Sequence, residues 1–489
     1  MMAIDGLSLG WAIHIEAFEA VLAAVLPALG RPQRVVGRPL FRRLRQLGVD
    51  RAVRSWALRL MAPRTDQRGG AAVVFVSELA TPSALEPAIE VGRALGRSFQ
   101  GDRRTLPALA LVADPRAFRA WRRTTVPAMP LLLGVGEERR ILASARRAIG
   151  PAWKHHRSHL PPLVVSGRDL TTVAATALAP LVARSTPWLF VERAALERAI
   201  DRTQPGVVVV TSDQHRIGRL SCAVAAARGL PSIVLQHGLP QSTLGYLPLA
   251  ADRVVAWSPS AVEWFAARGA PAERLLRAGN PRLDGLVRSD RAGTRQAVAS
   301  RVGVGADLNV LAALSVAAPE VNVRLVDTAI AALRQLDGSA LIVKLHPGGS
   351  DWRPVRARVT AARDLAARIR ILERDSLYPL LEWADVVVMH RSTVAAEALA
   401  AGRPVVAVRY AGGSVAALEI ASLDQPEVED GAGLAAILAG WSDPSARTRF
   451  LDERRSRLEW HVGPLDGHAA ERAAAIIAAA SGRRASDAS

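Results

Sequence analysis

Cysteine is almost absent from this sequence: Cys222 is the only one in 489 residues. A single thiol excludes an intrachain disulfide and a metal site built from cysteines. Such usage is typical of a protein that works in a reducing cytosol. We therefore expect the fold to be held together by apolar packing and hydrogen bonds.

Lysine is scarce as well and occurs only at Lys154 and Lys344, although Lys and Arg together number 63 and the formal net charge is +18. The charge is carried by arginines spread along the chain. An alanine- and arginine-rich, lysine-poor composition is typical of a GC-rich genome, and without a concentrated basic stripe it does not indicate nucleic-acid binding. We expect no nucleic-acid partner. Lys344 stands out because it lies two residues before His346.

Long apolar runs are missing too. No run reaches the roughly 18–20 residues that a membrane-spanning helix needs. Residues 11–30 are largely apolar, but His14, Glu16 and Glu19 interrupt them, so we expect no signal peptide. With 50% hydrophobic and 22% charged residues, the chain has the composition of a globular protein with room for two or three domains. The expected localisation is cytoplasmic.

Short apolar runs, each followed by a polar loop and a helix, dominate the second half of the chain. They cover residues 341–345, 386–389 and 405–408. This alternation predicts a parallel sheet of an α/β domain, in which ligands bind outside the carboxyl ends of the strands. The polar residues that follow the first two runs are Lys344, His346, Pro347, His390, Arg391, Ser392 and Thr393.

A similar pattern in the first half gives predicted strands at 73–76, 109–112, 207–210, 232–235 and 252–256. Asp213 follows the third of these, and Gln236, His237 and Gly238 follow the fourth. Gly238 allows a tight turn, so His237 is expected to stand exposed at the strand tip. Histidine is well suited to move a proton near neutral pH. A purely structural histidine remains an equal alternative.

The domain boundaries follow from these patterns. Residues 1–70 form a helical extension, with an apolar helix near 11–29 and an arginine-rich stretch behind it. This extension either rests on anionic lipid or packs on the next domain, and the acidic polar face of the first helix slightly favours packing. The first α/β domain spans 71–285, with the turn-rich segment 279–284 as linker. The second spans 286–440, C-terminal helices at 441–480 are expected to pack back on the first domain, and 481–489 form a disordered tail.

Five motifs together resemble a known family. They are QHG at 236–238, GNPRLDGL at 279–286, KLHP at 344–347, HRSTVAAEALAAGRPVV at 390–406 and GPLDGHAAERAAAII at 463–477. In this order they resemble bacterial GT-B glycosyltransferases, closest to the group of capsule-polysaccharide enzymes and CDP-glycerol glycerophosphotransferases, which is related to UDP-N-acetylglucosamine 2-epimerases. The resemblance implies two Rossmann-like domains facing across a cleft, with a C-terminal helix that crosses back to the first.

The resemblance also implies roles for the candidate residues. His346 and Pro347 would contact the donor phosphate, and Ser392 and Thr393 would bind diphosphate at a helix start. Glu397 would accept hydrogen bonds from the ribose, while Lys344 and Arg391 neutralise phosphate. His237 would be the base on the acceptor hydroxyl, oriented by Asp213. Further residues expected at the cleft are Gln236, Gly238, Ser315, His390, Asp466 and Gly467.

The implied reaction moves a sugar or a polyol phosphate from a CMP-, CDP- or UDP-linked donor to a hydroxyl acceptor in cell-surface polysaccharide synthesis. The acceptor would be a glycan, a lipid-linked molecule or a polyol phosphate, and peripheral contact with the inner face of the plasma membrane is expected to accompany a lipid-linked one. The sequence has no convincing DxD motif, so it does not require Mg²⁺, and no permanently bound cofactor or metal is expected.

Other functions remain open on the same fold. Glycerophosphate transfer and nucleotide-sugar epimerisation are the enzymatic alternatives. A GTRPE-like loop and an H-x-x-AGLR-like segment, which mark the epimerases, are absent from this sequence, and this disfavours epimerisation. The non-enzymatic alternative is an assembly protein that binds a nucleotide-sugar or polysaccharide without catalysis.

Overall fold

The computed structural model describes most of the chain. The described residues are 3–4, 7–8, 14–29, 49–61, 70–78, 81–98, 105–240, 243, 245–288, 291–315, 319–346, 351–390, 392, 394–409 and 423–482. Two compact units emerge: one comprises 1–256, 262–278 and 470–489, and the other comprises 257–261 and 279–469. Among the described residues, no helix combines the length and the apolar character needed to cross a bilayer.

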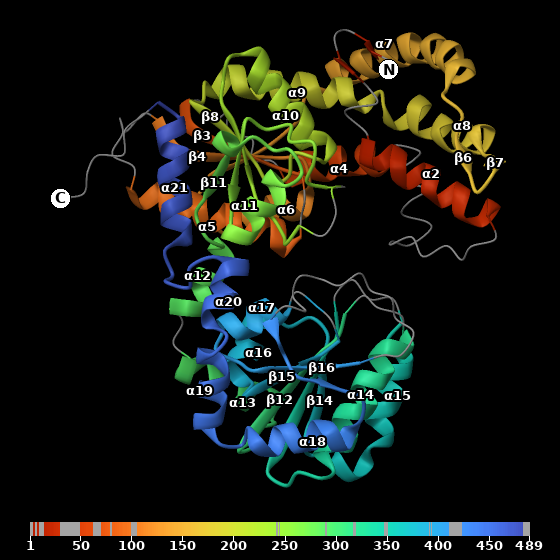
Figure 1. Ribbon diagram of the computed structural model, residues 1–489. Helices are drawn as coiled ribbons and strands as arrows, with labels where there is room; N and C mark the ends of the chain where they lie inside the picture. Colours follow the sequence, from red (N-terminus) through yellow and green to blue (C-terminus); the bar gives the residue numbers. More distant parts are fainter. Residues whose placement is uncertain are drawn as a thin grey trace. The chain divides into compact units, whose positions relative to one another are not determined.

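The first unit is built on a seven-stranded parallel sheet (Figure 1). Its strands, in sheet order, are β11 (Leu275–Arg277), β10 (Arg253–Ala256), β9 (Ser232–Leu235), β8 (Val207–Val210), β3 (Gly70–Ser77), β4 (Thr105–Val112) and β5 (Ala128–Pro130). The valine-rich central strands are buried because helices cover both faces, as expected for a parallel sheet. The five predicted strands are confirmed, while β5 and β11, at the two edges, were not predicted.

Two apolar cores flank this sheet. One holds side chains of α9 (Trp188–Thr203), α10 (Arg216–Ala227) and α11 (Pro259–Ala266). The other holds side chains of α5 (Pro82–Ser98), α6 (Pro115–Trp121) and the C-terminal helix α21 (Ala469–Ala480). Ala470, Ala473 and Ile477 of α21 are fully buried there. The chain's last helix thus packs on the first unit, as the resemblance implied, whereas α19 (Pro444–Asp452) and α20 (Arg455–Val462) belong to the second unit, contrary to the prediction for 441–480.

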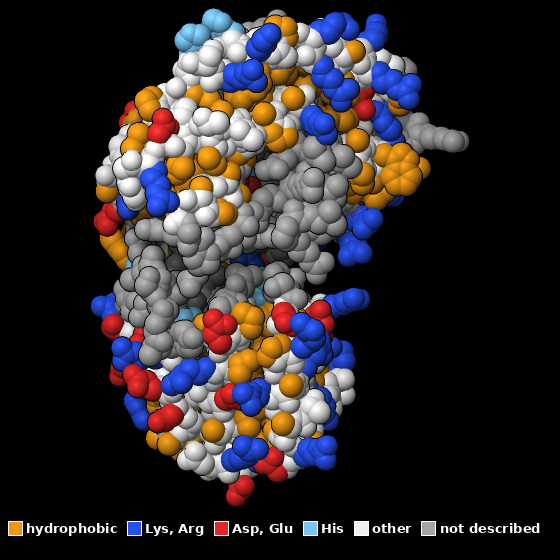
Figure 2. All heavy atoms as spheres, turned by 90° about the vertical axis from the view of Figure 1, so that its right-hand side faces the viewer, with side chains coloured by type: hydrophobic (Ala, Val, Ile, Leu, Met, Phe, Trp, Pro, Cys, Tyr) orange, Lys and Arg blue, Asp and Glu red, His pale blue; other side chains and the backbone are white. Residues whose placement is uncertain are grey.

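Further helices pack around the first unit. They are α2 (His14–Ala28), α4 (Val49–Met61), α7 (Val135–His156) and α8 (Thr171–Pro180). α2 packs against α8, and α4 packs against the sheet through Leu58. On the face drawn in Figure 2, Lys and Arg side chains of the first unit lie with apolar side chains between them.

The second unit contains a six-stranded parallel sheet. Its order is β14 (Ile369–Leu372), β13 (Ser339–Lys344), β12 (Leu308–Ala313), β15 (Val386–Met389), β16 (Val405–Val408) and β17 (Glu427–Val428). The helices α14 (Pro319–Leu333), α16 (Leu377–Trp383), α17 (Val394–Ala400) and α18 (Gly431–Gly440) surround it. The predicted fold class, a two-domain α/β protein of GT-B type, is confirmed.

One prediction about the chain's layout is wrong. The turn-rich segment 279–284 does not close the first domain as a linker, because helix α12 (Pro281–Arg288) begins inside it. The backbone N–H of Arg282 donates to the side chain of Asn280 at 3.2 Å, and Pro281 occupies the first helical position. Asparagine before a helix and proline in its first turn are helix-start signals as well as turn signals. The helix belongs to the second unit.

Candidate functional site

In the second unit, the sheet order brings the predicted donor residues to one edge. β13 and β15 both pair with β12, in parallel register that aligns Ala313 with Lys344 and with Met389. The residues that follow these three strands therefore lie at the same carboxyl edge: Ser315, His346, His390 and Ser392. Pro347, Arg391 and Thr393 lie outside the described residues.

His346 and Ser392 remain accessible at this edge. Both are half-buried. Burial and the neighbouring Lys344 lower the pKa of His346, so its imidazole is neutral at pH 7. The Ser392 hydroxyl accepts a hydrogen bond from the backbone N–H of Val394 at 3.3 Å, at the start of α17. A neutral imidazole and a hydroxyl in this place can both donate to an anionic group.

Lys344 and His390 are more enclosed than the sequence suggested. The Lys344 ammonium donates to the backbone oxygens of Leu345, at 2.6 Å, and Glu373, at 3.1 Å, and burial lowers its pKa. His390 is buried, and its Nδ1 lies 2.9 Å from the backbone oxygen of Val408. Both side chains tie neighbouring strand ends together, so they shape the edge on which a ligand would lie.

Glu397 is engaged by an arginine that sequence reasoning missed. Arg282 of α12 donates to the Glu397 carboxylate at 2.6 Å, and its guanidinium lies 5.6 Å from the ring centre of Tyr378. Both charged side chains are largely buried, at 15% and 13% exposure. Arg282 lies in the GNPRLDGL motif, so the motif contained this residue. The sequence did not show that Arg282 pairs with Glu397.

The remaining second-unit candidates are held by local contacts. Ser315 exchanges two backbone hydrogen bonds with the side chain of Asn322, at 3.2 and 3.1 Å. The Asp466 carboxylate accepts from the backbone N–H of His468 at 2.9 Å, and the Gly467 carbonyl accepts from Arg288. Gly467 has a φ of +76°, which explains why glycine is required there.

In the first unit, His237 follows β9 as predicted, but it is half-buried instead of standing exposed at the strand tip. Its ring stacks on Tyr246, with 5.0 Å between ring centres and 7° between planes. Its Nδ1 is buried and has no hydrogen-bond partner among the described residues. Burial, together with nearby His215, lowers the pKa of His237 to about 4. The imidazole is therefore neutral at pH 7, as a proton acceptor must be, although its low basicity limits the driving force.

Gly238 and Gln236 fit closely around this stack. A Cβ on Gly238 would lie 2.9 Å from the hydroxyl oxygen of Tyr246, so a larger residue would disturb the ring. The Gln236 side chain is buried and donates to the backbone oxygen of Gly238 at 2.9 Å. The local backbone thus depends on the QHG sequence itself.

Asp213 has a different role from the predicted one, because it does not orient Nδ1 of His237. Its carboxylate accepts from the backbone N–H groups of Ala250, at 2.7 Å, and Ala251, at 3.1 Å, and from Gln214. Burial raises the pKa of Asp213 above its ordinary value. Asp213 therefore anchors the loop between β9 and β10.

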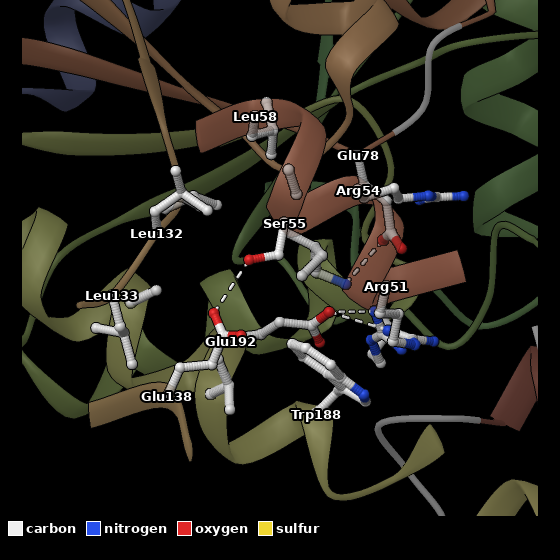
Figure 3. A pocket seen from close by; sticks show the side chains of 16 residues that line it. Arg51, Arg54, Ser55, Leu58, Glu78, Leu132, Leu133, Glu138, Trp188 and Glu192 are labelled. Atoms are coloured by element: carbon white, nitrogen blue, oxygen red, sulfur yellow. Dashed lines mark hydrogen bonds and ion pairs between the residues drawn. The ribbon is translucent and has the colours of Figure 1, made fainter. Parts of the chain in front are cut away.

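A cavity lined by both apolar and charged side chains lies at the same edge of the first sheet (Figure 3). It is lined by Glu78, which follows β3, by residues of α4 and α9, and by Arg216 and Ile217 at the start of α10. Glu192 accepts hydrogen bonds from Arg51, at 2.9 Å, and from Arg216. The participation of α4 in this cavity was not predicted from the sequence.

The charges around the cavity are balanced. Arg51, Arg54 and Arg216 face Glu78, Glu138 and Glu192. The Glu78 carboxylate accepts from the backbone N–H of Ile217 at 2.8 Å, and Ser55 donates to Glu138 at 3.0 Å. Nε and Nη1 of Arg216 are buried and have no partner within the described part of the chain. Such a mixture of donors and acceptors suits neutral hydroxyl groups better than a lone anion.

The comparisons with known proteins address the fold. No family model and no curated protein matches the chain. Solved structures that resemble it include a putative UDP-N-acetylglucosamine 2-epimerase from Listeria monocytogenes (14% identity, TM-score 0.54, 84% of this chain and 96% of that one). Another is HepE from Anabaena in complex with UDP (14%, 0.51, 83% and 99%). A third is MnaA with UDP from S. aureus (13%, 0.51, 84% and 96%). At these identities the likeness supports the two-domain fold.

Proposed function

We propose that this protein is a nucleotide-sugar-dependent enzyme that transfers a sugar or a polyol phosphate to a hydroxyl acceptor in cell-envelope polysaccharide synthesis. The observation that carries the proposal is the convergence of His346, Ser392 and the Arg282–Glu397 pair in the second unit, at or beside the carboxyl edge of its sheet. Two solved structures of similar fold are complexes with UDP, which supports a nucleotide as a ligand of this protein.

Each residue at this edge has a chemical task in the proposal. Ser392 and His346 donate to the phosphates of the donor, and Glu397, steadied by Arg282, shares its carboxylate with ribose hydroxyls. Negative charge that develops on the leaving nucleotide is stabilised by these fixed donors. In the first unit, the neutral imidazole of His237 takes the proton of the acceptor hydroxyl as that hydroxyl attacks the donor. No step in this proposal requires a metal ion.

Nucleotide binding tests the proposal without knowledge of the acceptor. Melting temperatures are measured with CMP, CDP, UMP, UDP, GDP and ADP, each with and without Mg²⁺. A nucleotide at about 100 times its dissociation constant should stabilise the protein by roughly 2.7 kcal/mol. Ser392→Ala should abolish most of the response, whereas Ser376→Ala, which removes an exposed hydroxyl of the same unit, should preserve it. A protein that responds to none of the nucleotides would contradict the proposal.

A second candidate function is nucleotide-sugar epimerisation, because UDP-N-acetylglucosamine 2-epimerases recur among the structures of the same fold. Product analysis separates the two reactions. Incubation with a UDP-sugar and no acceptor should give a stereoisomer of the intact UDP-sugar if the protein is an epimerase. A transferase should instead leave the sugar nucleotide unchanged until a hydroxyl acceptor is added.

A further inference from the structure

Helix α4 has an unusual distribution of polar and apolar residues. Where the structure describes its side chains, its exposed positions are Ala52, Val53, Trp56 and Leu60, all of them apolar. Val53, Trp56 and Leu60 are 55%, 63% and 67% exposed. At spacings of three and four residues, they form one stripe along the helix. A surface helix normally turns such a stripe toward the core.

The inward face of α4 is the polar one. Arg51 bonds Glu192 and Ser185, at 2.9 and 3.2 Å, while Ser55 and Arg59 bond Glu138 of α7 at 3.0 and 2.6 Å. These bonds, together with the buried Leu58, fix the orientation of the helix. The apolar stripe is therefore held outward by specific contacts on the opposite face.

The helix α7, which α4 contacts through Glu138, carries a basic surface. Glu138, which joins α4 to α7, is followed on α7 by exposed Arg139, Arg140, Arg146, Arg147 and Lys154. Residues 139–168 contain no acidic residue. Exposed Val135 lies at the start of the same helix, next to the α4 contact. Figure 2 shows Lys and Arg side chains gathered with apolar ones on this unit.

We propose that the apolar stripe of α4 and the basic face of α7 together dock the first unit on an anionic lipid surface. Tryptophan and leucine suit the boundary between headgroups and acyl chains, and arginines beside them suit anionic headgroups. Nucleic acid would match the basic face but leave the stripe in water. A second copy of the chain would bring two basic faces together. The arginine-rich, acid-free stretch 31–46 that precedes α4 in the sequence adds charge of the same sign.

The docking helix also forms a wall of the cavity that contains Glu192. Arg51, Arg54 and Ser55 line that cavity from the inward face of α4. A surface that docks on lipid through the outer face would hold the cavity within one helix diameter, about 10 Å, of the headgroups. This arrangement fits an acceptor whose hydroxyl lies at the membrane, and in this respect alone the inference rests on the proposed function.

Co-flotation with vesicles tests the docking surface. The full chain is mixed with vesicles of phosphatidylcholine, with or without phosphatidylglycerol, in the absence of nucleotide. We expect binding to the anionic vesicles only. The triple variant V53S/W56S/L60S should lower the partition coefficient by at least about tenfold. R146Q/R147Q should lower it about fivefold per charge removed, and high salt should weaken it likewise.

A control variant and melting-temperature measurements accompany the vesicle experiment. Trp460→Ser removes an exposed tryptophan of the second unit and should leave vesicle binding unchanged. Melting temperatures of all variants must match that of the parent, since the replaced side chains are exposed. The proposal is overturned if the parent protein does not bind anionic vesicles, or if the triple variant binds as well as the parent. A parent dimer that the triple variant turns into a monomer, without vesicle binding, would assign the stripe to a second copy. Nucleotide binding is measured separately, so failure here leaves the proposed function standing.

Discussion

The carboxyl edges of the two sheets are built in contrasting ways. At the edge of the first unit, His237 stacks on Tyr246, and the Asp213 carboxylate is engaged by two backbone N–H groups and by Gln214, so both side chains are held by contacts within the protein. At the edge of the second unit, His346 and Ser392 are half-exposed. The contrast suits a division of labour in which the first edge acts on a neutral hydroxyl and the second receives a charged ligand. Four changes can break or sharpen this contrast.

The largest effect is expected for His237→Ala. Loss of a general base typically lowers turnover by about 10²–10⁴-fold. Nucleotide affinity, measured by calorimetry, should stay unchanged because the binding residues belong to the other unit. His159→Ala, which removes an exposed histidine, provides the control. Near-normal turnover of the His237 variant would make this histidine structural.

The pH dependence of the free energy of unfolding tests the environment of His237 in a second way. Its folded-state pKa of about 4 lies below the ordinary value of 6.5. Between these values the unfolded chain binds a proton that the folded protein does not, so stability should fall as the pH drops from 6.5 toward 4. In His237→Ala this contribution should vanish. Identical pH profiles of the two proteins in chemical denaturation would contradict the burial of the ring.

The next effect concerns Asp213→Ala. The change leaves the backbone N–H groups of Ala250 and Ala251 without their acceptor, and we expect a loss of about 1–3 kcal/mol in the free energy of unfolding. Asp201→Ala breaks an exposed ion pair with Arg228 and should cost less than about 1 kcal/mol. Urea denaturation measures both. Equal losses would mean that the loop does not depend on the Asp213 carboxylate.

Glu397→Gln probes the second unit. The amide keeps the shape of the side chain but weakens both the pairing with Arg282 and the proposed bonds to ribose. We expect roughly tenfold weaker nucleotide binding, because hydrogen bonds to charged groups contribute about 1.5–3 kcal/mol. Glu320→Gln changes an exposed acid of the same unit and should have no effect. Unaltered affinity of the Glu397 variant would remove this residue from the nucleotide site.

The smallest effect is expected for Gly238→Ala. The added Cβ would approach the Tyr246 hydroxyl to 2.9 Å and tilt the ring that stacks on His237. Overpacking by one methyl group typically costs about 1–3 kcal/mol of folded-state stability. Part of this cost is relieved by movement of the ring, so we expect turnover to fall by less than about tenfold. Tyr246→Phe removes the hydroxyl, so the double variant should recover turnover. A double variant as impaired as Gly238→Ala would place the clash elsewhere.

The sequence determined much of this protein. The valine-rich runs form the central strands because a parallel sheet is buried on both faces and needs continuous apolar segments. The loops after those strands carry Asp213, His237, His346 and Ser392. Polar residues are expected there because the end of a buried strand is followed by residues that can contact solvent or ligand. Helix α12 was missed because Asn280 and Pro281 signal a turn and a helix start alike.

Only the tertiary structure decided what surrounds these residues. The burial of His237 depends on Tyr246, the carbonyls that hold Lys344 depend on the neighbouring strand, and the partner of Glu397 comes from a helix more than a hundred residues away. The same holds for α4, whose apolar stripe is turned outward by bonds from Arg51 and Arg59 to distant helices. Local sequence sets strand and helix, but solvation and charge pairing are set by neighbours that only the folded chain brings together.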